Sequence, residues 1–526
     1  MARDLLPSPV KLGLPAKFQE WRPNQDLAAK DGVECQKRFI AQIQRTGAGK
    51  TVTYMAQGMM MPDSRVIFLT STKGLQAQLM DEFSSIGLVN IQGKSTYDCE
   101  GIPGHSCESG SLSKCVYKGS SMCPHFVAKQ AASTERLVTS NYSCWIASYK
   151  YGNGFGHFDC MVCDEAHNLP DELSRALSIQ IGEREIHEDI KREWPSDASD
   201  MDAWKHWARV SRFTADQHLQ RLKEEIDKNG SKPKPHTVQQ YQHFYSLVRR
   251  LAEIAICRPS KWVVDTWMHG YQFDPIEPSE YAERTLFRGV EKVLLTSGTL
   301  KRKVLTMLGI ESDYEVFDYP SSADPFRCPI MYIPTTRVNY YSQPWELRKL
   351  VARIDEIFEG RTDRKGIVHT SNYKLRDFIF THSKYSRFMI SNYSGSGDIT
   401  SQVVDRFKAT RPPALLVTPS VTTGYDFLKD FCRYQIVAKL GYPYAVSKIE
   451  IARAKLDPDR GSFLAVQTLE QAFGRGDRDD NDFQEFFILD DAFPTLKWKH
   501  EKLFSPIFLM NVRTLTKVPP APEIAA

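Results

Sequence analysis

A glycine-rich segment at residues 44–51, QRTGAGKT, contains the residue types that bind the phosphates of a nucleotide. In such a loop the backbone N–H groups surround the phosphates, the lysine reaches the β- and γ-phosphates, and the last hydroxyl binds Mg²⁺. The predicted ATP contacts are those of Thr46, Gly47, Ala48, Gly49, Lys50 and Thr51, with Thr51 also a Mg²⁺ ligand. The match is imperfect, because Gln44 stands where the pattern GxxxxGKS/T has a small residue, so a chance glycine-rich turn is the alternative.

An acidic pair follows a later apolar run, CMVC at residues 160–163. Asp164 and Glu165 then stand at the carboxyl end of a predicted strand, which is where open α/β sheets bind their ligands. There Asp164 can hold Mg²⁺, and Glu165 can orient and deprotonate the water that attacks the γ-phosphate. A solvated acidic turn is the alternative, but it does not explain why a phosphate-binding loop precedes the pair. We expect the two cysteines of the run to pack inside the strand.

These two segments belong to a longer series of apolar runs that alternate with helical patterns. The runs predicted to be strands lie within residues 38–44, 64–70, 160–167, 292–298, 364–370, 414–420 and 433–440. Strands that alternate with helices are typical of βαβ units and parallel sheets. Because the runs fall into one group before about residue 305 and another after about residue 320, we predict an α/β protein with two such domains.

The composition limits the class of protein. The chain has 526 residues, of which 41% are hydrophobic and 25% charged. This is the balance of a multidomain globular protein and excludes collagen-like, low-complexity and wholly disordered chains. No apolar run is long enough to span a membrane and no secretory signal opens the sequence, so we expect a cytoplasmic protein with no membrane partner. The net charge of +4 neither requires nor excludes nucleic acid, and the odd number of cysteines, 11, argues against a disulfide framework.

The phosphate-binding loop and the DEAH sequence at residues 164–167 together resemble those of superfamily 2 helicases, and further motifs follow in that family's order. WRPNQ places Gln25 where these proteins bind the adenine of ATP. LTSTKGLQAQL (69–79) resembles the motif that contacts the nucleic-acid backbone. LTSGTL (295–300) resembles the S-A-T motif that couples hydrolysis to movement, with Gly298 in the alanine position.

Three later motifs resemble those of the second motor domain of these helicases: GIVHTSNYKL (366–375), TPSVTTGYDF (418–427) and QAFGRGDR (471–478). In the second of them Thr423 replaces the glutamate of the family pattern. The third resembles a motif whose arginines stabilise charge on the transferring γ-phosphoryl group. The resemblance implies ATP contacts from Gly424 and Asp426 and catalytic roles for Gln471, Arg475 and Arg478.

The resemblance also implies roles for residues near the strand ends. The residues expected to couple hydrolysis to movement are His167, Ser297 and Thr299. The residues expected to contact nucleic acid are Thr70, Ser71, Thr72, Thr370 and Ser371.

Two insertions resemble those of the XPD/DinG helicases, which carry a cysteine-ligated 4Fe–4S domain before the DEAH motif and a helical arch after it. The first interval here contains Cys99, Cys107, Cys115 and Cys123, with seven residues between neighbours. Four thiolates suit a 4Fe–4S cluster, and they equally suit tetrahedral zinc, where His105 or His125 could substitute. The absence of a CxxC knuckle favours iron–sulfur, and four unrelated thiols are the remaining alternative.

The second interval, residues 180–257, is predicted to be helical. Trp204, Trp207, Val210 and Phe213 recur at helical spacing and predict a buried seam, and a second helix is expected from about residue 236 to 256.

The expected fold is therefore two RecA-like motor domains with a cysteine-rich insertion and an arch in the first. The predicted boundaries are 1–95, 141–179 and 258–315 for the first motor domain, 96–140 for the iron–sulfur domain, 180–257 for the arch, 316–512 for the second motor domain, and 513–526 for a disordered tail.

The function implied by the resemblance is an ATP-dependent DNA helicase that moves 5′ to 3′ on single-stranded or forked DNA, with polarity resting on the resemblance alone. RNA or an R-loop is an alternative substrate, because backbone contacts dominate the binding of single strands. Two further alternatives are a translocase that does not unwind duplex and a nucleic-acid-binding accessory subunit with a weak ATPase. Protein partners cannot be read from the sequence.

Overall fold

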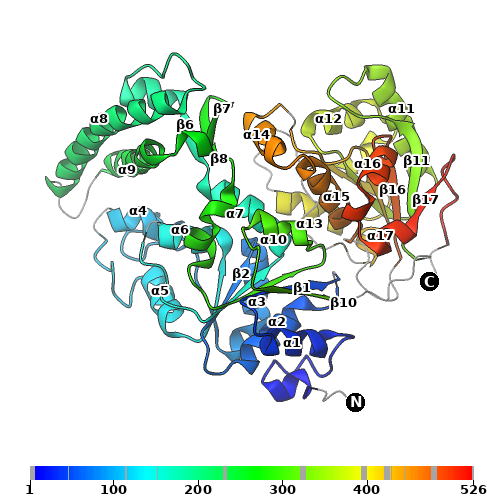
Figure 1. Cartoon of the computed structure of the whole chain (residues 1–526), viewed down its shortest axis with the longest axis horizontal. Helices are drawn as coiled ribbons and strands as arrows, with labels where there is room; N and C mark the ends of the chain where they lie inside the picture. Colours follow the sequence, from blue (N-terminus) through cyan, green and yellow to red (C-terminus); the bar gives the residue numbers. More distant parts are fainter. Residues whose placement is uncertain are drawn as a thin grey trace. The chain divides into compact units, whose positions relative to one another are not determined.

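The computed structural model describes residues 6–45, 47–112, 115–150, 152–228, 234–319, 327–391, 400–419, 427, 429–444, 446–474 and 483–523. The chain divides into two compact units (Figure 1). The first contains residues 1–43, 51–318 and 445–456, and the second contains residues 44–50, 319–444 and 457–526. No helix in the described part of the chain is both long enough and apolar enough to cross a membrane.

The described residues of the first unit contain a seven-stranded sheet of order β10-β1-β9-β5-β2-β4-β3. Its strands are β1 (Phe39–Gln44), β2 (Val66–Thr70), β3 (Leu88–Asn90), β4 (Leu137–Asn141), β5 (Cys160–Asp164), β9 (Lys292–Ser297) and β10 (Tyr314–Tyr319). From β1 to β3, each neighbouring pair is parallel. Every residue of β2, β4 and β5 is buried, as expected for parallel strands whose two faces are both covered.

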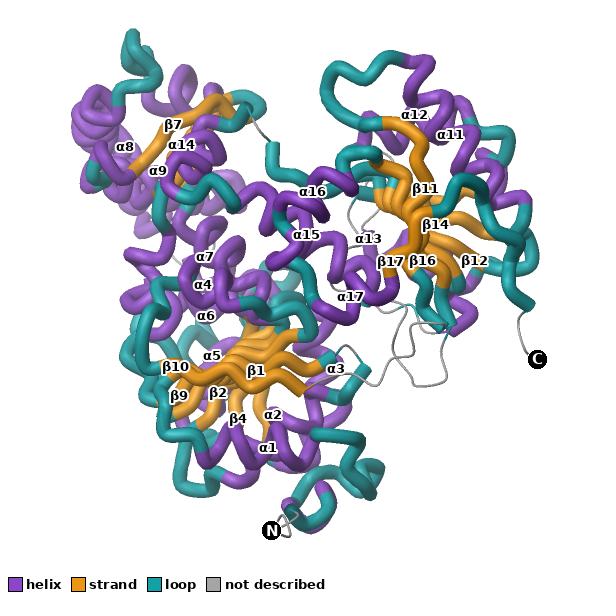
Figure 2. Tube along the Cα trace, turned by 45° about the vertical axis from the view of Figure 1, so that its right-hand side comes forward, coloured by secondary structure: helices purple, strands orange, loops and turns teal. Residues whose placement is uncertain are grey.

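Helices lie on both faces of this sheet (Figure 2). They include α1 (Gln25–Glu34), α2 (Lys50–Met60), α3 (Lys73–Phe83), α6 (Tyr142–Lys150), α7 (Leu169–Leu177) and α10 (Arg302–Met307). The cysteine-rich insertion adds two more, α4 (Cys107–Leu112) and α5 (Pro124–Thr134).

The predicted helical arch differs from the structure in its boundaries and content. Its two long helices, α8 (Met201–Lys228) and α9 (Pro235–Ile256), pack on an antiparallel sheet of order β6-β8-β7. These strands are β6 (Ile179–Gly182), β7 (Trp262–Trp267) and β8 (Gly270–Pro275), so the arch continues about 20 residues beyond its predicted end. Glu185–Ile190 forms a π-helical turn after β6.

The predicted aromatic seam of α8 is correct for two of its four residues. Trp204 and Trp207 are buried and touch edge to face, with ring centroids 5.1 Å apart. Phe213 is instead 68% exposed, because the buried face of the helix continues through Ser211 and Ala215. The spacing of the aromatic residues predicts the helix correctly but places its buried face at the wrong position around the helix axis.

The described residues of the second unit contain a seven-stranded sheet of order β13-β14-β12-β15-β16-β11-β17, and every neighbouring pair is parallel. Its strands are β11 (Ile330–Thr336), β12 (Lys365–His369), β13 (Met389–Ile390), β14 (Ala414–Thr418), β15 (Tyr434–Val437), β16 (Glu485–Asp490) and β17 (Val512–Thr514). Its helices are α11 (Pro344–Glu359), α12 (Tyr373–His382), α13 (Thr400–Ala409), α15 (Arg460–Phe473), α16 (Phe493–Lys499) and α17 (Pro506–Asn511). The predicted class, two α/β domains with parallel sheets, is confirmed.

The predicted disordered tail begins too early. β17 extends the second sheet by pairing with β11, and the carbonyls of Pro519 and Pro522 accept hydrogen bonds from Arg361 and Arg364. Leu515 and Val518 also pack against the hydrophobic core of the second unit, so pairing at the sheet edge and apolar contacts together order this segment.

One helix leaves its sequence neighbours. α14 (Lys448–Leu456) follows β15 in the chain but belongs to the first unit, where it packs against β7. The Lys448 N–H donates to Asp265 at 2.8 Å, and the Arg453 guanidinium donates to the Pro275 carbonyl at 3.0 Å and to the Ser174 hydroxyl at 2.7 Å. The chain therefore passes from the second unit to the first and back again.

Candidate nucleotide-binding and hydrolysis site

The predicted phosphate-binding loop connects the end of β1 to the start of α2. Gly47 and Gly49 have φ angles of 87° and 79°, a left-handed conformation that glycine adopts without steric cost. Lys50 and Thr51 open α2, where the helix N-terminus favours bound anions. Gln44 is the last residue of β1, so the departure from the pattern falls at the end of a strand. Thr46 lies outside the described residues.

The acidic pair lies at the carboxyl end of β5, two strands from β1 in the sheet. Asp164 ends the strand, and one of its carboxylate oxygens accepts the Glu165 N–H at 2.9 Å. Glu165 has φ 52° and ψ 45°, a left-handed conformation that is costly for a residue with a side chain. Such strain is often found where the backbone must aim a functional group, as a catalytic carboxylate requires.

Two buried phenols interact with Asp164. The Tyr142 hydroxyl donates to the Asp164 carbonyl at 2.6 Å. Burial and, next, the Asp164 carboxylate raise the pKa of Tyr54, whose phenol also hydrogen-bonds the Thr51 side chain. Tyr54 therefore contacts one of the two predicted Mg²⁺ ligands and lies within electrostatic range of the other. A hydroxyl and a carboxylate are the hard oxygen donors that Mg²⁺ prefers, so these residues fit the ion.

A buried histidine connects β5 to β9. His167 Nδ1 lies 2.5 Å from the Ser297 hydroxyl and 3.3 Å from Glu165 Oε2. The same hydroxyl accepts the Thr299 N–H at 3.2 Å. The three predicted coupling residues thus form one chain of contacts that begins at the candidate general base.

Sequence reasoning missed a second polar group behind the site. The Gln42 and Gln57 amides both donate to the Ala28 carbonyl, at 2.6 and 2.8 Å, and Gln57 also donates to Gln42. This network joins α1, β1 and α2. It helps to fix α1, where Gln25 is buried and its side-chain oxygen accepts the Arg22 N–H at 2.8 Å. The sequence signal for this network is Gln42, a polar residue inside the apolar run that forms β1.

The two predicted nucleic-acid motifs have the same local structure. The Thr70 hydroxyl donates to the Thr72 carbonyl at 3.1 Å, and the Thr370 hydroxyl donates to the Asn372 carbonyl at 3.2 Å. Thr72 caps α3 and Asn372 caps α12. Both Thr70 and Thr370 are buried, whereas Ser371 and the three residues that follow it are exposed. The buried threonines therefore shape the two loops, and the residues after them face solvent.

In the second unit, α15 carries Gln471. The helix is tied to the sheet where the Gln435 amide donates to the Ala472 carbonyl at 2.8 Å, while the other end of that amide lies 2.7 Å from His369 Nε2. Four predicted residues, Gly424, Asp426, Arg475 and Arg478, lie outside the described residues.

The four cysteines of the insertion form two pairs. Cys99 Sγ lies 3.5 Å from Cys115 Sγ, and Cys107 Sγ lies 3.9 Å from Cys123 Sγ. Burial raises the pKa of Cys99 and Cys107, but backbone N–H groups of Gly101 and Ile102 donate to the Cys99 sulfur and favour its thiolate. Within the described residues, no three His, Cys, Asp or Glu side chains converge on a position that could hold a metal ion. The thiol donors fit a metal centre, but the four sulfurs lie in two separate pairs and not in one four-ligand arrangement.

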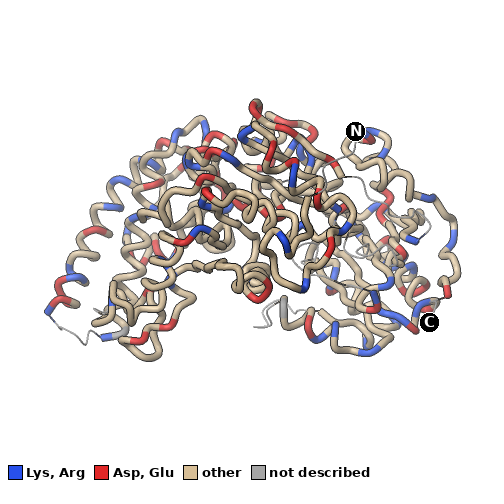
Figure 3. The backbone as a smooth tube through the Cα atoms, turned by 90° about the horizontal axis from the view of Figure 1, so that it is seen from below, with Lys and Arg blue, Asp and Glu red and all other residues tan. Residues whose placement is uncertain are grey.

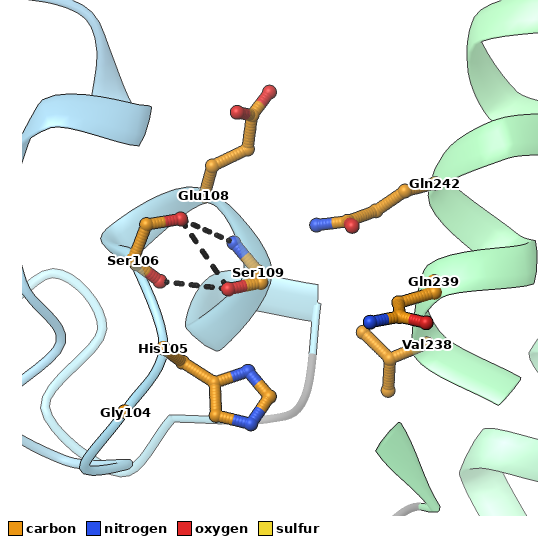
Figure 4. Close-up of a pocket in the computed structure, with 8 residues that line it drawn as sticks. All are labelled: Gly104, His105, Ser106, Glu108, Ser109, Val238, Gln239 and Gln242. Carbon is orange, nitrogen blue, oxygen red and sulfur yellow. Dashed lines mark hydrogen bonds between the residues drawn. The ribbon is translucent and has the colours of Figure 1, made fainter. Parts of the chain in front are cut away.

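A cavity of about 400 Å³ lies between this insertion and the arch. Figure 4 shows its walls: His105, Ser106, Glu108 and Ser109 on one side, with Val238, Gln239 and Gln242 of α9 opposite. These described wall residues include a carboxylate but no lysine or arginine, so they offer phosphate no positive side chain. Elsewhere basic and acidic residues are interspersed along the chain (Figure 3).

Two segments of the chain match models of known protein families. Residues 18–193 match the family described as the res subunit of type III restriction enzymes, and residues 361–505 match the helicase C-terminal domain. No curated protein matches the chain.

Solved structures of XPD proteins share the fold. One XPD helicase superposes with a TM-score of 0.69 at 16% identity, covering 93% of this chain and 98% of that one. An apo XPD structure gives 0.60 at 16% identity, covering 93% and 99%. An S. tokodaii XPD protein gives 0.57 at 13% identity, covering 93% and 98%.

The two parallel sheets, with the predicted phosphate-binding loop and acidic pair at the strand ends of the first, are the arrangement expected of a nucleotide-hydrolysing motor with RecA-like domains. The two family matches and the shared fold make the class more specific. The chain is an ATP-hydrolysing nucleic-acid helicase of superfamily 2 with the XPD-like architecture.

Proposed function

We propose that this helicase acts on DNA, moves 5′ to 3′ along single strands and couples ATP hydrolysis to the separation of duplex. The observation that carries the coupling is the contact chain from Glu165 through His167 to Ser297 and Thr299. A change at the candidate base can reach the end of β9 through direct side-chain contacts. DNA as substrate and the polarity rest on the resemblance to XPD/DinG helicases.

The proposed hydrolysis uses groups at one edge of the first sheet. Lys50 and the loop N–H groups would bind the phosphates, and Thr51 and Asp164 would hold Mg²⁺, which supplies charge neutralisation when bound. Glu165 would take the proton of the attacking water, and His167 Nδ1 lies close enough to hold that carboxylate in position. Gln25 would contact adenine.

The second motor domain would complete the reaction. Gln471 would lie beside the phosphate or the water, and Arg475 and Arg478 would stabilise the charge that develops on the transferring phosphoryl group. Gly424 and Asp426 would add further contacts to ATP. These assignments rest on the sequence motifs.

We further propose that residues 96–140 form a metal-binding domain with Cys99, Cys107, Cys115 and Cys123 as ligands. The family resemblance favours a 4Fe–4S cluster. The sulfur spacing favours zinc, because a Zn–S bond of about 2.3 Å implies tetrahedral S–S edges of about 3.8 Å, close to both observed pairs. Iron, zinc and sulfide analysis of the purified protein distinguishes the two.

Strand displacement tests the proposed function directly. Duplexes with a 5′ or a 3′ single-stranded tail are offered with ATP, and release of a labelled strand is followed alongside phosphate release, with Lys50→Ala as the inactive control. We expect release only from the 5′-tailed DNA. ATP turnover stimulated by single strands without any release would instead identify a translocase, and turnover indifferent to nucleic acid would leave the accessory-subunit alternative. The same duplexes with an RNA loading strand test the RNA alternative.

A further inference from the structure

A group of aromatic side chains is exposed at the carboxyl edge of the second sheet. Tyr340 and Tyr341, in the loop after β11, are 80% and 81% exposed. Trp345, in the first turn of α11, is 57% exposed, and Tyr373, at the start of α12, is 40% exposed. Across described residues 327–391, these four rings are the large hydrophobic side chains that face solvent. We call them the aromatic patch.

Contacts join the parts of this patch. The rings of Tyr340 and Tyr341 meet edge to face with centroids 5.4 Å apart. Lys374 Nζ lies 6.0 Å from the Tyr340 ring centroid, which brings the loop after β11 beside the start of α12. Lys349 Nζ lies 4.6 Å from the Trp345 ring. The patch therefore combines flat rings with positive charges at two places, the tyrosine loop beside the start of α12 and the first turns of α11 a few residues further along the chain.

The loop that presents the tyrosines is held in place by its own hydrogen bonds. The Tyr341 N–H donates to Asn339 Oδ1 at 2.7 Å, and the Asn339 N–H donates to the Ser342 hydroxyl at 2.8 Å. Gln343 and Glu346 form a capping box at the start of α11. The rings are thus displayed by an ordered turn, although two tyrosines in water gain nothing from burial.

Rings interleaved with lysines match the chemistry of an unpaired nucleic-acid strand. Bases stack on aromatic faces whatever their sequence, and lysines attract the phosphates between them. The exposed Ser371, which follows buried Thr370 at the end of β12, directly precedes Asn372 and Tyr373, so the patch is continuous with the predicted backbone contact.

We propose that Tyr340, Tyr341 and Trp345, with Tyr373, Lys349 and Lys374 beside them, form a stacking platform for the unpaired bases of a single strand. This proposal rests on the proposed function, since it assumes that the second unit holds a single strand. The proposal adds that the second unit contacts the bases of the strand as well as its backbone. Binding should therefore depend on the presence of bases and not on their sequence.

The test compares a normal oligonucleotide with an abasic one of the same length and charge. The unaltered protein should bind the abasic strand at least tenfold more weakly. The combined variant Tyr340→Ala, Tyr341→Ala and Trp345→Ala should lose at least tenfold for the normal strand and bind both strands equally. Trp345→Phe should retain binding, because a flat ring remains. Trp498→Ala, which removes a ring that is 79% exposed on α16 of the same unit, is the matched control.

The outcomes separate this proposal from the function on which it rests. Equal binding of normal and abasic strands by the unaltered protein, or undiminished binding by the combined variant, would overturn the platform and favour a protein partner for these rings. An unaltered protein that binds no single strand at all would remove the proposed function itself. Photocrosslinking of an iodouracil-containing strand should label the patch residues and fall away in the combined variant.

Discussion

The carboxyl edge of the first sheet, where the candidate nucleotide site lies, and the cysteine-rich insertion belong to the same chain but are stabilised in different ways. We call the first of these two regions the nucleotide edge. At the nucleotide edge, Asp164 and Ser297 are buried at the ends of β5 and β9, and His167 is buried in the turn after β5. In the insertion, Val116 and Met122 are 74% and 55% exposed, and the helices α4 and α5 have 6 and 11 residues. A large apolar sheet can orient catalytic groups unaided, whereas a small loop-rich segment needs cross-links such as bound metal. The first region should therefore respond to loss of single functional groups, and the second to loss of its sulfur ligands.

The largest effect is expected at the nucleotide edge. Lys50→Ala and Glu165→Gln should each abolish ATP turnover, the first by weakening nucleotide binding and the second by removing the base while binding persists. Steady-state phosphate release and binding of a fluorescent nucleotide measure the two properties. Glu34→Gln, at the far end of α1, is the control. A Glu165→Gln protein that turns over ATP at the normal rate would show that this carboxylate is not the base.

The second-largest effect concerns the arginines of the last motif. Arg475→Ala or Arg478→Ala should slow hydrolysis by about 10³- to 10⁵-fold, which is the usual contribution of an arginine finger, with little change in ATP affinity. Arg460→Ala, at the start of α15, should leave turnover close to normal. Normal hydrolysis in both finger variants would show that the nucleotide edge works without the second motor domain.

In the insertion, loss of a cysteine sulfur should lower the rate of unwinding more than the rate of ATP hydrolysis. Cys99→Ser, Cys107→Ser, Cys115→Ser and Cys123→Ser should each lower the bound metal and the rate of strand displacement, while basal ATP turnover stays within about threefold, because the nucleotide edge has its own core. Metal content, absorbance near 400 nm and strand displacement are measured on anaerobically purified protein. Cys35→Ser is the control. If the purified protein contains neither iron nor zinc, the insertion keeps its fold without a bound metal.

A smaller effect is expected from the contact chain behind the base. Ser297→Ala removes the hydroxyl that meets both His167 and the Thr299 N–H. Loss of such a hydrogen bond should lower a rate by about tenfold at most. The decrease should appear in the stimulation of ATP turnover by single strands and not in the basal rate of turnover. Ser211→Ala removes a buried hydroxyl in the arch and serves as the control. Equal loss of basal and stimulated turnover would indicate a role in hydrolysis itself.

The smallest effect tests the insertion without removing a ligand. A methyl group at Gly110 of α4 would lie 2.3 Å from Cys99 Sγ, too close for contact, so Gly110→Ala should shift that sulfur and lower metal content only in part. Ser111→Ala, the next residue on the same helix, is exposed at its side chain and should have no effect. Full metal occupancy in Gly110→Ala would mean that the sulfur pair can move freely.

The sequence predicted the buried parallel strands well, because runs such as those of β2 and β5 are apolar throughout. It missed the sheet of the arch, whose strand β6 pairs with β8 some 90 residues later, so that no local turn marks the partnership. Gln42 and Gln57 also escaped notice, since a polar residue inside an element indicates a network only once its partner is known. The motifs identified candidate site residues, but only the fold shows that Tyr142 hydrogen-bonds the Asp164 carbonyl and that Tyr54 lies within electrostatic range of the Asp164 carboxylate.

The double crossing of the chain at α14 affects how the protein is made. The first unit is complete only when residues 445–456 have left the ribosome, about 140 residues after the rest of that unit ends at residue 318. At synthesis rates of about 5–20 residues per second, this is a delay of roughly 7–28 s. Throughout that interval the face of β7 and the carbonyl of Pro275 that α14 will cover are accessible to other molecules. A nascent chain of this protein should therefore depend on chaperones longest at the arch, and a fragment that ends before α14 should retain that dependence permanently.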